Sequence, residues 1–415
     1  MVKKVAVNKL KPGMFVHDLN CGWLDHPFFS SRFKIKSYDD IKKIAGHGIR
    51  ELYIDTDKGL DVEGAMSETE VKKALQKEIE QVAASRPVPA KEAPVKEAPI
   101  KEVPINEEIK RAKEVKDEAK KLVVNILEEV RLGKHIETEK VGSVVTEMAD
   151  SVFRNQDALI SLSRIKLMDE YLFFHSVSVC VLMISFCRIM GVDRATINNV
   201  GVGALLHDIG KTKTPPEILN KPGKLSDNEF QIMKLHSSHS YKILLANGGI
   251  PEVGLQVAHE HHERYDGSGY PRGLRGEAIS KYGQMAAIVD VYDAITSDRC
   301  YHKGLQPSDA VRKLFEWSKF HFNNELVQYF IKCVGIYPVG TLVRLDDDNL
   351  AVVTEVGRKN LTTPKVKVVY STRQRRLIKP FEIDLAEHPN KRKIVGAEDP
   401  AEWGVNPFDY VGTGI

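Results

Sequence analysis

Seven histidine and aspartate residues are spaced widely along one long stretch of this chain, whose apolar residues recur with the periodicity of helices. Four of them form two doublets, one His-Asp and one His-His, and the other three flank or separate the doublets. Side chains from at least five segments can meet only where several helices converge, which is how helical bundles build metal sites in their cores. The pattern therefore predicts a mainly α fold organised around a helical bundle. The seven residues are His175, His207, Asp208, His236, His261, His262 and Asp290.

The ligand types in this set indicate which metals it would hold. Imidazole nitrogens and carboxylate oxygens suit iron, manganese or zinc, and the set offers no thiolate of the kind that structural zinc fingers use. Asp208 is central in the set, and its carboxylate can bridge two cations. Two bridged cations are what two-metal hydrolysis of phosphodiesters requires. We therefore predict a two-metal site.

The composition of the chain narrows its class. With 415 residues it can hold two or three domains, and a net charge of +3 gives no reason to expect a nucleic-acid polymer as a partner. The sequence shows no secretory signal. The most apolar segment, 177–190, has 14 residues, too few to span a bilayer, so we expect a buried core helix there. Five cysteines without a CxxC pair fit reduced thiols, and we expect a cytoplasmic protein without a membrane partner.

Residues 1–64 predict a small α+β N-terminal domain, to which we assign a regulatory role. Short alternating runs surround Pro12-Gly13, as expected for strands joined by a turn. No phosphorylation signature of a receiver domain is found in this segment. The expected elements are strands at 5–10, 14–18 and 49–54 and a helix at 39–45.

Residues 65–106 are expected to form a linker. Units of Lys-Glu-Ala-Pro or Lys-Glu-Val-Pro repeat every five residues from Lys91 to Pro104. Regular proline with interspersed charge disfavours a packed core and favours an extended, semi-rigid chain. A role in docking a partner is the less favoured interpretation.

Residues 107–334 predict the helical catalytic domain, and residues 335–415 a small β extension with a tail. The first helix, 107–132, has an apolar stripe that fits two interpretations equally: a connecting or dimerising helix, or simply the first helix of the bundle. Further helices are expected at 141–165, 170–190, 195–208, 227–245, 251–263, 281–297 and 307–333. Strands are expected at 341–345, 351–356 and 366–370.

Several motifs follow one another between residues 171 and 304. His207-Asp208 is followed by Lys211, and His261-His262 is followed by the triplet Gly269-Tyr270-Pro271. The run Asp290–Arg299 comes next. Each doublet alone is a weak signal, but all of them in this order are very specific, and together they resemble the HD-GYP family. That family is the branch of HD-superfamily phosphohydrolases that cleaves cyclic dinucleotides. Residues 1–64 resemble the small domain of unknown function that often precedes it.

The resemblance implies a role for each ligand. Asp208 would bridge the two metals, with iron or manganese preferred and other divalent metals allowed. A hydroxide that also bridges them would be the nucleophile that attacks the phosphate. The other ligands of the first metal would be His175, His207 and Asp290. The other ligands of the second metal would be His236, His261 and His262.

The resemblance also implies the residues that touch substrate. Lys211 would act beside Asp208 in catalysis, stabilising charge on a phosphate oxygen or on the leaving oxygen, unless it is a solvated lysine after a helix end. Tyr270 would present its hydroxyl or ring to a phosphate or guanine, unless its loop is only a structural turn. Arg299 would bind phosphate or a guanine edge, unless it forms a surface salt bridge. His302 or Lys303 would replace the basic residue that the family often carries after this arginine.

One departure from the family bears on the number of metals. Some members carry a glutamate one turn before the first histidine and bind a third metal. Here Tyr171 occupies that position, and Glu170 lies on a different helical face, so two metals are favoured over three.

The favoured function is hydrolysis of cyclic di-GMP to linear pGpG, with further cleavage to GMP left open. One alternative is hydrolysis of another cyclic dinucleotide such as cyclic GMP-AMP. The other is a weakly active nucleotide-binding signalling scaffold, against which the intact ligand set argues. A homodimer or a signalling protein partner is left open.

Overall fold

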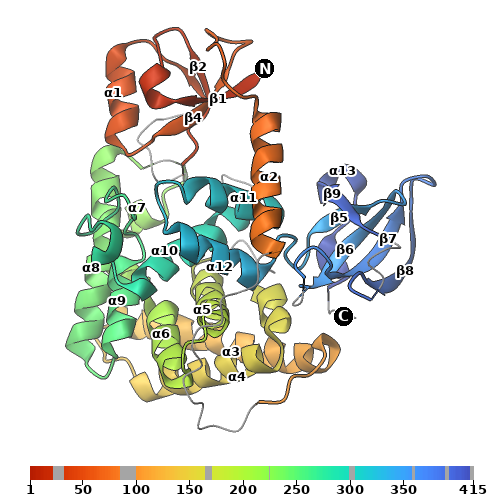
Figure 1. Cartoon of the computed structure of the whole chain (residues 1–415). Coiled ribbons are helices and arrows are strands. Elements are labelled where there is room, and N and C mark those ends of the chain that lie inside the picture. Colours follow the sequence, from red (N-terminus) through yellow and green to blue (C-terminus); the bar gives the residue numbers. More distant parts are fainter. Residues whose placement is uncertain are drawn as a thin grey trace.

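The computed structural model of this chain is mainly helical and confirms the predicted fold class, with a helical bundle between two small β-containing parts (Figure 1). No helix in the part of the chain that the structure describes is long and apolar enough to cross a membrane. The structure describes residues 1–21, 32–84, 100–163, 171–223, 225–298, 304–357, 360–387 and 392–411.

The bundle is organised around helix α5 (Tyr171–Ile189), which lies in the middle of it (Figure 1). Residues 174–187 of α5 are buried without interruption, because the segment is apolar on all sides and carries only small polar residues and one histidine. The expected core helix at 177–190 is therefore confirmed. The helices around α5 place the doublets at or near helix ends. The bundle elements are α3 (Ile105–Arg131), α4 (Thr138–Ser163), α5 (Tyr171–Ile189), α6 (Arg194–Leu206), the 3-10 helix η4 (Ile209–Lys213), α7 (Pro216–Leu219), α8 (Asp227–Asn247), α9 (Glu252–Glu260), the 3-10 helix η5 (Gly276–Ala278) and α10 (Lys281–Thr296).

The expected single helix at 307–333 is wrong, because the chain forms two helices there. α11 (Pro307–Trp317) ends before a turn, and α12 (Asn324–Val334) begins after Asn323. The Asn323 side chain accepts hydrogen bonds from the backbone amides of Glu325 and Leu326, which caps the start of the second helix. Asparagine at this position favours a helix start over a helix interior.

The N-terminal part is a small antiparallel sheet with one helix, as expected for an α+β domain. Its strands are ordered β1-β4-β2-β3, and the side chain of Ser37 begins α1 through a capping box with Asp40. Ile44 of α1 packs into the same core as the buried strand residues Val5, Val16 and Leu52. The elements are β1 (Val2–Ala6), the 3-10 helix η1 (Val7–Lys9), β2 (Phe15–Asp18), β3 (Phe33–Lys34), α1 (Tyr38–Gly46) and β4 (Glu51–Asp55).

Part of the expected linker is a packed helix, which corrects the interpretation of residues 65–106. α2 (Glu68–Ala84) contacts α11 and α12. Val71, Leu75 and Ile79 are buried and share the core of the bundle. Their spacing of four residues puts them on one helical face, a signal that the proline-rich repeat overshadowed. Residues 85–99, which hold most of that repeat, lie outside the described residues.

The C-terminal part is a five-stranded antiparallel sheet beside the bundle (Figure 1), in the order β8-β7-β6-β5-β9. The sequence indicated three of these strands and missed β8 and β9. β8 is mostly exposed and contains Pro380, so it lacks the buried alternation on which strand predictions depend. The elements are β5 (Leu342–Leu345), β6 (Asn349–Glu355), β7 (Lys365–Ser371), β8 (Arg376–Asp384), β9 (Ile394–Ala397), α13 (Pro400–Trp403) and the 3-10 helix η6 (Pro407–Asp409).

Candidate metal centre

The fold brings all seven candidate ligands to one place inside the bundle. They come from α5, the end of α6, α8, the end of α9 and α10. Six of them form two groups in each of which the ligand atoms lie within 4.8 Å of one another. The seventh, Asp290, lies 3.0 Å from the first group, measured from its Oδ1 to His175 Nε2. The first group is His175, His207 and Asp208, and the second is His236, His261 and His262.

Asp208 directs one carboxylate oxygen toward each group. Its Oδ2 lies 3.6 Å from His175 Nε2 and 3.4 Å from His207 Nε2. Its Oδ1 lies 3.4 Å from His236 Nε2 and 3.9 Å from His261 Nε2. Oδ1 is also buried without a hydrogen-bond donor among the described residues. A buried carboxylate oxygen without a donor is costly, and a cation beside it would remove that cost.

The histidine rings are held in one tautomer by the helices that carry them. In His207 and in His236, the Nδ1 atom lies 2.7 Å from the backbone carbonyl oxygen three residues earlier. In His261 the corresponding distance is 3.0 Å. A carbonyl oxygen only accepts hydrogen bonds, so Nδ1 carries the proton in all three rings. Their Nε2 atoms are therefore left with lone pairs.

These Nε2 atoms face one another at short distances. His207 Nε2 lies 3.3 Å from His175 Nε2, and His236 Nε2 lies 3.2 Å from His261 Nε2 and 3.1 Å from His262 Nε2. Lone pairs that converge in this way repel one another unless a cation lies between them. The donor set therefore fits two divalent metal ions with nitrogen and oxygen ligands.

Three of the candidate ligand histidines are kept neutral, as metal ligands must be. Burial lowers the pKa of His236 to about 4 and that of His262 to about 3, and it holds the pKa of His261 well below its usual value. His175 differs, because hydrogen bonds with Asp290 and Asp293 outweigh burial and raise its pKa. A metal at Nε2 would displace a proton from that ring.

Asp293, to which the sequence analysis assigned no role, also contacts the candidate site. Its Oδ2 lies 2.7 Å from His175 Nδ1. A carboxylate behind a ligating histidine fixes the orientation of the ring and strengthens its free nitrogen as a donor to a metal. Its position three residues after Asp290, on the same face of α10, was the available signal.

Lys211 reaches the carboxylate at the centre of the site. Its Nζ donates to Asp208 Oδ2 over 2.5 Å, and that charge outweighs burial in holding the pKa of Asp208 well below its usual value. The short 3-10 helix η4 that carries Lys211 packs directly on α8. A β-carbon at Gly210 would lie 2.0 Å from the carbonyl oxygen of His236, so only glycine permits this contact.

The loop after His262 folds back onto that histidine. The Tyr270 amide donates to the His262 carbonyl over 3.0 Å, and the two rings lie 4.6 Å apart between centroids. A β-carbon at Gly269 would lie 2.3 Å from the Arg264 nitrogen, which explains glycine at that position. Tyr270 therefore lies beside the second histidine group. Three other substrate-binding candidates, Arg299, His302 and Lys303, lie outside the described residues.

The position that bears on a third metal is only partly described. Glu170 lies outside the described residues, and Tyr171 begins α5. The preference for two metals over three stays a prediction.

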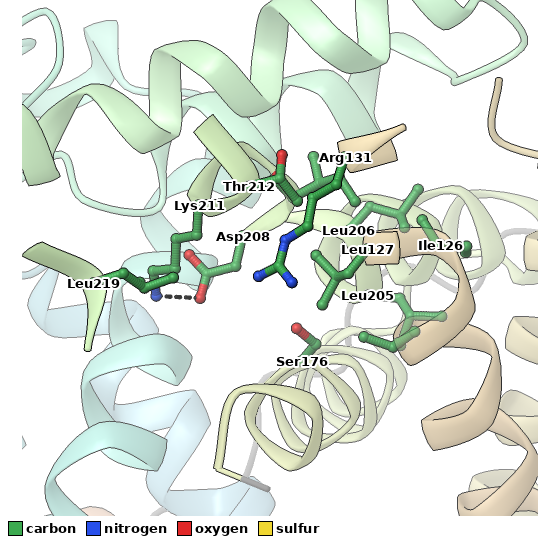
Figure 2. A pocket seen from close by; sticks show the side chains of 12 residues that line it. Ile126, Leu127, Arg131, Ser176, Leu205, Leu206, Asp208, Lys211, Thr212 and Leu219 are labelled. Carbon is green, nitrogen blue, oxygen red and sulfur yellow. Dashed lines mark hydrogen bonds and ion pairs between the residues drawn. The ribbon is translucent and has the colours of Figure 1, made fainter. Parts of the chain in front are cut away.

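Arg131, at the end of α3, is a cation near Asp208 that sequence reasoning missed. A small cavity is lined by Arg131, Ser176, Asp208 and Lys211. Figure 2 shows the guanidinium of Arg131 directed into the space between Asp208 and Ser176. Lys211 approaches Asp208 from the side opposite to Arg131. Arg131 follows no motif, and only the packing of α3 on the bundle brings it here.

A second cavity, of about 250 Å³, is lined by residues of the second histidine group. His261, His262 and Tyr270 line it together with Phe230 and Lys234 of α8. The Lys234 ammonium lies 5.4 Å from the centre of the Tyr270 ring. Aromatic faces with a nearby cation suit a ligand that has both rings and phosphates.

Two known domain families match the sequence. A domain of unknown function (DUF3391) matches residues 2–141. The match extends beyond the expected domain boundary at residue 64 and includes α2, α3 and the first residues of α4. An HD domain matches residues 149–326.

Curated relatives match over different lengths. The cyclic di-GMP phosphodiesterase PA4108 of Pseudomonas aeruginosa is 40% identical over 418 residues, which cover 100% of this chain and 96% of the relative. A cyclic di-GMP phosphodiesterase of Thermotoga maritima is 36% identical over 45% of this chain and 50% of its own length. The 3'3'-cGAMP-specific phosphodiesterase 1 of Vibrio cholerae is 36% identical over 37% of this chain and 36% of its own.

Among solved structures, Bd1817 from Bdellovibrio bacteriovorus, described as an HDG"Y"P protein, aligns with a TM-score of 0.46. It is 18% identical, and the alignment covers 80% of this chain and 98% of Bd1817.

Proposed function

Since this chain belongs to the HD-GYP family of HD-domain phosphohydrolases, we propose that it is a metal-dependent phosphodiesterase that hydrolyses cyclic di-GMP to linear pGpG. The relative that matches over the whole chain is named a cyclic di-GMP phosphodiesterase. The observation that carries the proposal is the position of Asp208 between two histidine groups, with one oxygen toward each. Residues 107–334 would form the catalytic domain, in the cytoplasm.

We assign the ligands from these distances. Asp208 would be shared between the metals, and iron or manganese suits the nitrogen and oxygen donors. When bound, the two cations supply an activated water and positive charge that offsets the charge on the phosphate. The first metal would be held by His175, His207 and Asp290 as well as Asp208. The second would be held by His236, His261 and His262 as well as Asp208.

The remaining residues would orient the substrate and stabilise its charge. Lys211, already beside Asp208, would meet a phosphate oxygen or the leaving oxygen as negative charge develops. Arg131 would offer its guanidinium to a phosphate from the other side of Asp208. Tyr270 would stack on or donate to a guanine, and Arg299 with His302 or Lys303 would complete the basic surface.

The proposal is tested by product analysis. The purified chain, loaded anaerobically with iron or manganese, is incubated with cyclic di-GMP, cyclic GMP-AMP and cyclic di-AMP, and the products are separated by chromatography. We expect pGpG from cyclic di-GMP, and loss of activity when the metals are removed by a chelator. A metal-loaded protein that cleaves none of these substrates contradicts the proposal.

A second candidate is preference for cyclic GMP-AMP, because relatives of comparable identity over the catalytic region are named cGAMP-specific phosphodiesterases. The same panel separates the two candidates by the ratio of kcat/KM for the two cyclic dinucleotides. Cyclic di-GMP is favoured because the relative that matches along the whole chain carries that name.

A further inference from the structure

The N-terminal domain is fixed to the bundle by a buried polar cluster. Glu316 of α11 is only 4% exposed, and its Oε1 accepts from Tyr53 Oη at 2.8 Å and from Asn20 Nδ2 at 3.1 Å. The Lys4 ammonium lies 2.8 Å from the same oxygen. Trp317 Nε1 donates to Asn20 Oδ1 over 3.0 Å. Because a buried carboxylate must keep its partners, this cluster holds the domain in one position relative to the bundle.

That position brings one segment of the N-terminal domain to the catalytic cavity. Gly46 and His47, at the end of α1, line the same 250 Å³ cavity as His262 and Tyr270. Figure 1 shows α1 next to the start of α8, which supplies Phe230 and Lys234 to this cavity.

The contact between the two parts is direct. Gly48 has a φ of +77°, and a β-carbon there would lie 2.8 Å from Ser268 Cβ. Ser268 belongs to the loop that carries Tyr270. Position 48 therefore favours glycine for two reasons: the backbone has a positive φ, and the loop lies too close for a β-carbon. Gly46 and His47, held next to this contact, form one wall of the cavity beside His261 and His262.

His47 is the member of this wall with hydrogen-bonding capacity. Its Nδ1 lies 2.8 Å from the carbonyl oxygen of Lys43, so Nδ1 carries a proton that it donates there. Nε2 of the neutral ring is then an acceptor. Among the residues that the structure describes, no group forms a hydrogen bond with Nε2.

We propose that the N-terminal domain completes the substrate site, and that His47 is a specificity-determining residue whose Nε2 accepts a hydrogen bond from the base of the cyclic dinucleotide. This inference rests on the proposed function. The cavity is smaller than the roughly 300–1,000 Å³ of pockets that enclose a whole ligand, so it suits one nucleoside of the substrate while a phosphate lies at the histidine groups.

The acceptor favours guanine over adenine. The Watson–Crick edge of guanine presents a donor at N1 and a second at the neighbouring exocyclic amine, whereas adenine has an acceptor at N1 and its single donor at the amine on the opposite side of N1. Adenine held in the position of guanine would place the N1 acceptor opposite Nε2 and leave Nε2 unpaired, which disfavours adenine at this site. His47 would thus contribute to selection of cyclic di-GMP.

The test compares His47→Ala with the unchanged full-length chain, both loaded with manganese. Each is assayed with cyclic di-GMP and with bis(p-nitrophenyl) phosphate, a diester that carries no base. We expect the KM for cyclic di-GMP to rise about tenfold with kcat nearly unchanged, the effect of one hydrogen bond made equally in the ground and transition states. The KM for the small diester should stay nearly unchanged, because that substrate carries no base. Damage to the metal site would instead affect the kinetics of both substrates equally.

A second variant tests the wall without relying on a deletion. A β-carbon at Gly46 would meet nothing within 4 Å, so Gly46→Leu should fold normally and fill part of the cavity. We expect it, too, to raise the KM for cyclic di-GMP more than that for the small diester. Lys42→Ala is the matched control, because Lys42 is exposed on the same helix and does not line the cavity.

The outcomes separate the two claims. If the unchanged chain cleaves the small diester but no cyclic di-GMP, the proposed function fails and this inference falls with it. If the chain cleaves cyclic di-GMP, while His47→Ala and Gly46→Leu both keep a KM within about twofold of the control, the inference alone is overturned.

Discussion

The carboxylate of Asp208 has one oxygen near His175 and His207 and the other near His236 and His261, at distances between 3.4 and 3.9 Å. Asp208 lies between the C-cap of α6 and the start of η4, where the chain changes from an α-helix to a 3-10 helix. A single residue can thus join two groups of ligands that come from different helices. Substitutions at and next to Asp208 are therefore the most direct tests at this scale.

Asp208→Asn should remove most of the bound metal. The amide keeps the size of the side chain but loses the charge that both metal positions share. Elemental analysis of the purified protein measures the effect, with Asp227→Asn, an exposed acid at the start of α8, as the control. Two metal equivalents retained in Asp208→Asn would show that this residue does not bridge.

Lys211→Met should lower kcat about a hundredfold while metal remains bound, because the lysine acts on charge that develops in the transition state. Steady-state kinetics with cyclic di-GMP and metal analysis on the same samples measure both quantities. Lys213→Met, an exposed lysine of the same 3-10 helix, should behave as the unchanged chain. If kcat is unchanged in Lys211→Met, Lys211 has no role in the transition state and its ion pair with Asp208 is purely structural.

At the scale of elements, η4 and α8 approach so closely that no side chain fits between them. The Gly210 amide donates to Ser240 Oγ over 2.9 Å, and its α-carbon lies against the backbone near His236. This contact fixes Asp208 and Lys211 of one element relative to His236 of the other. The alignment of the two histidine groups thus depends on a glycine that ligates nothing.

Gly210→Ala should destabilise the protein by about 1–3 kcal/mol, because the added methyl group forces the two elements apart. The metal content should fall with it, since His236 moves away from Asp208. Gly142→Ala is the matched control. Gly142 lies in α4 with nothing within 4 Å of an added β-carbon, and alanine there should stabilise the helix by about 0.5–1 kcal/mol. Thermal unfolding measures both, and an unchanged Tm for Gly210→Ala would contradict the close contact.

At the scale of the whole molecule, the N-terminal domain, α2 and the bundle form one packed body. Val71, Leu75 and Ile79 of α2 are buried in the bundle core, and the Glu316 cluster joins the N-terminal sheet to α11. At the edge of this cluster, Lys313 of α11 donates to Asp18 Oδ2 over 2.9 Å. Removal of the N-terminal domain would therefore expose core residues and leave a buried carboxylate without partners.

The ion pair between Asp18 and Lys313 should make the domain contact sensitive to acid. Burial disfavours the charged carboxylate, but Lys313 outweighs burial and lowers the pKa of Asp18. Because the pKa is lowered in the folded state, the ion pair stabilises the protein at pH values above the pKa of the unfolded state, about 3.9. This contribution is lost as the pH falls through the lowered pKa of the folded state. The Tm difference between the unchanged chain and Asp18→Asn should thus be constant from neutral pH to about 5 and shrink below about 4. Asp346→Asn, at an exposed acid in the turn after β5, serves as the control, and a Tm difference that grows toward low pH would contradict the sign.

Local patterns were enough to predict much of this protein. Helical periodicity indicated most of the bundle helices, and α5 followed from its uninterrupted apolar run. Predictions went wrong where one signal masked another. The proline repeat hid α2, and a long apolar pattern hid the turn before Asn323.

The chemistry of the candidate site could be predicted from the sequence, because short motifs give the type and order of its ligands without knowledge of distant contacts. Which atoms face one another depends instead on how distant segments pack. In the folded chain each oxygen of Asp208 faces its own histidine group, Asp293 lies behind His175, and Arg131 and His47 line two different cavities at the site. Arg131 and His47 lie far from the motifs along the chain. Their positions depend on the packing of α3 and on the buried Glu316 cluster, and such contacts between distant segments leave no periodicity or spacing in the sequence.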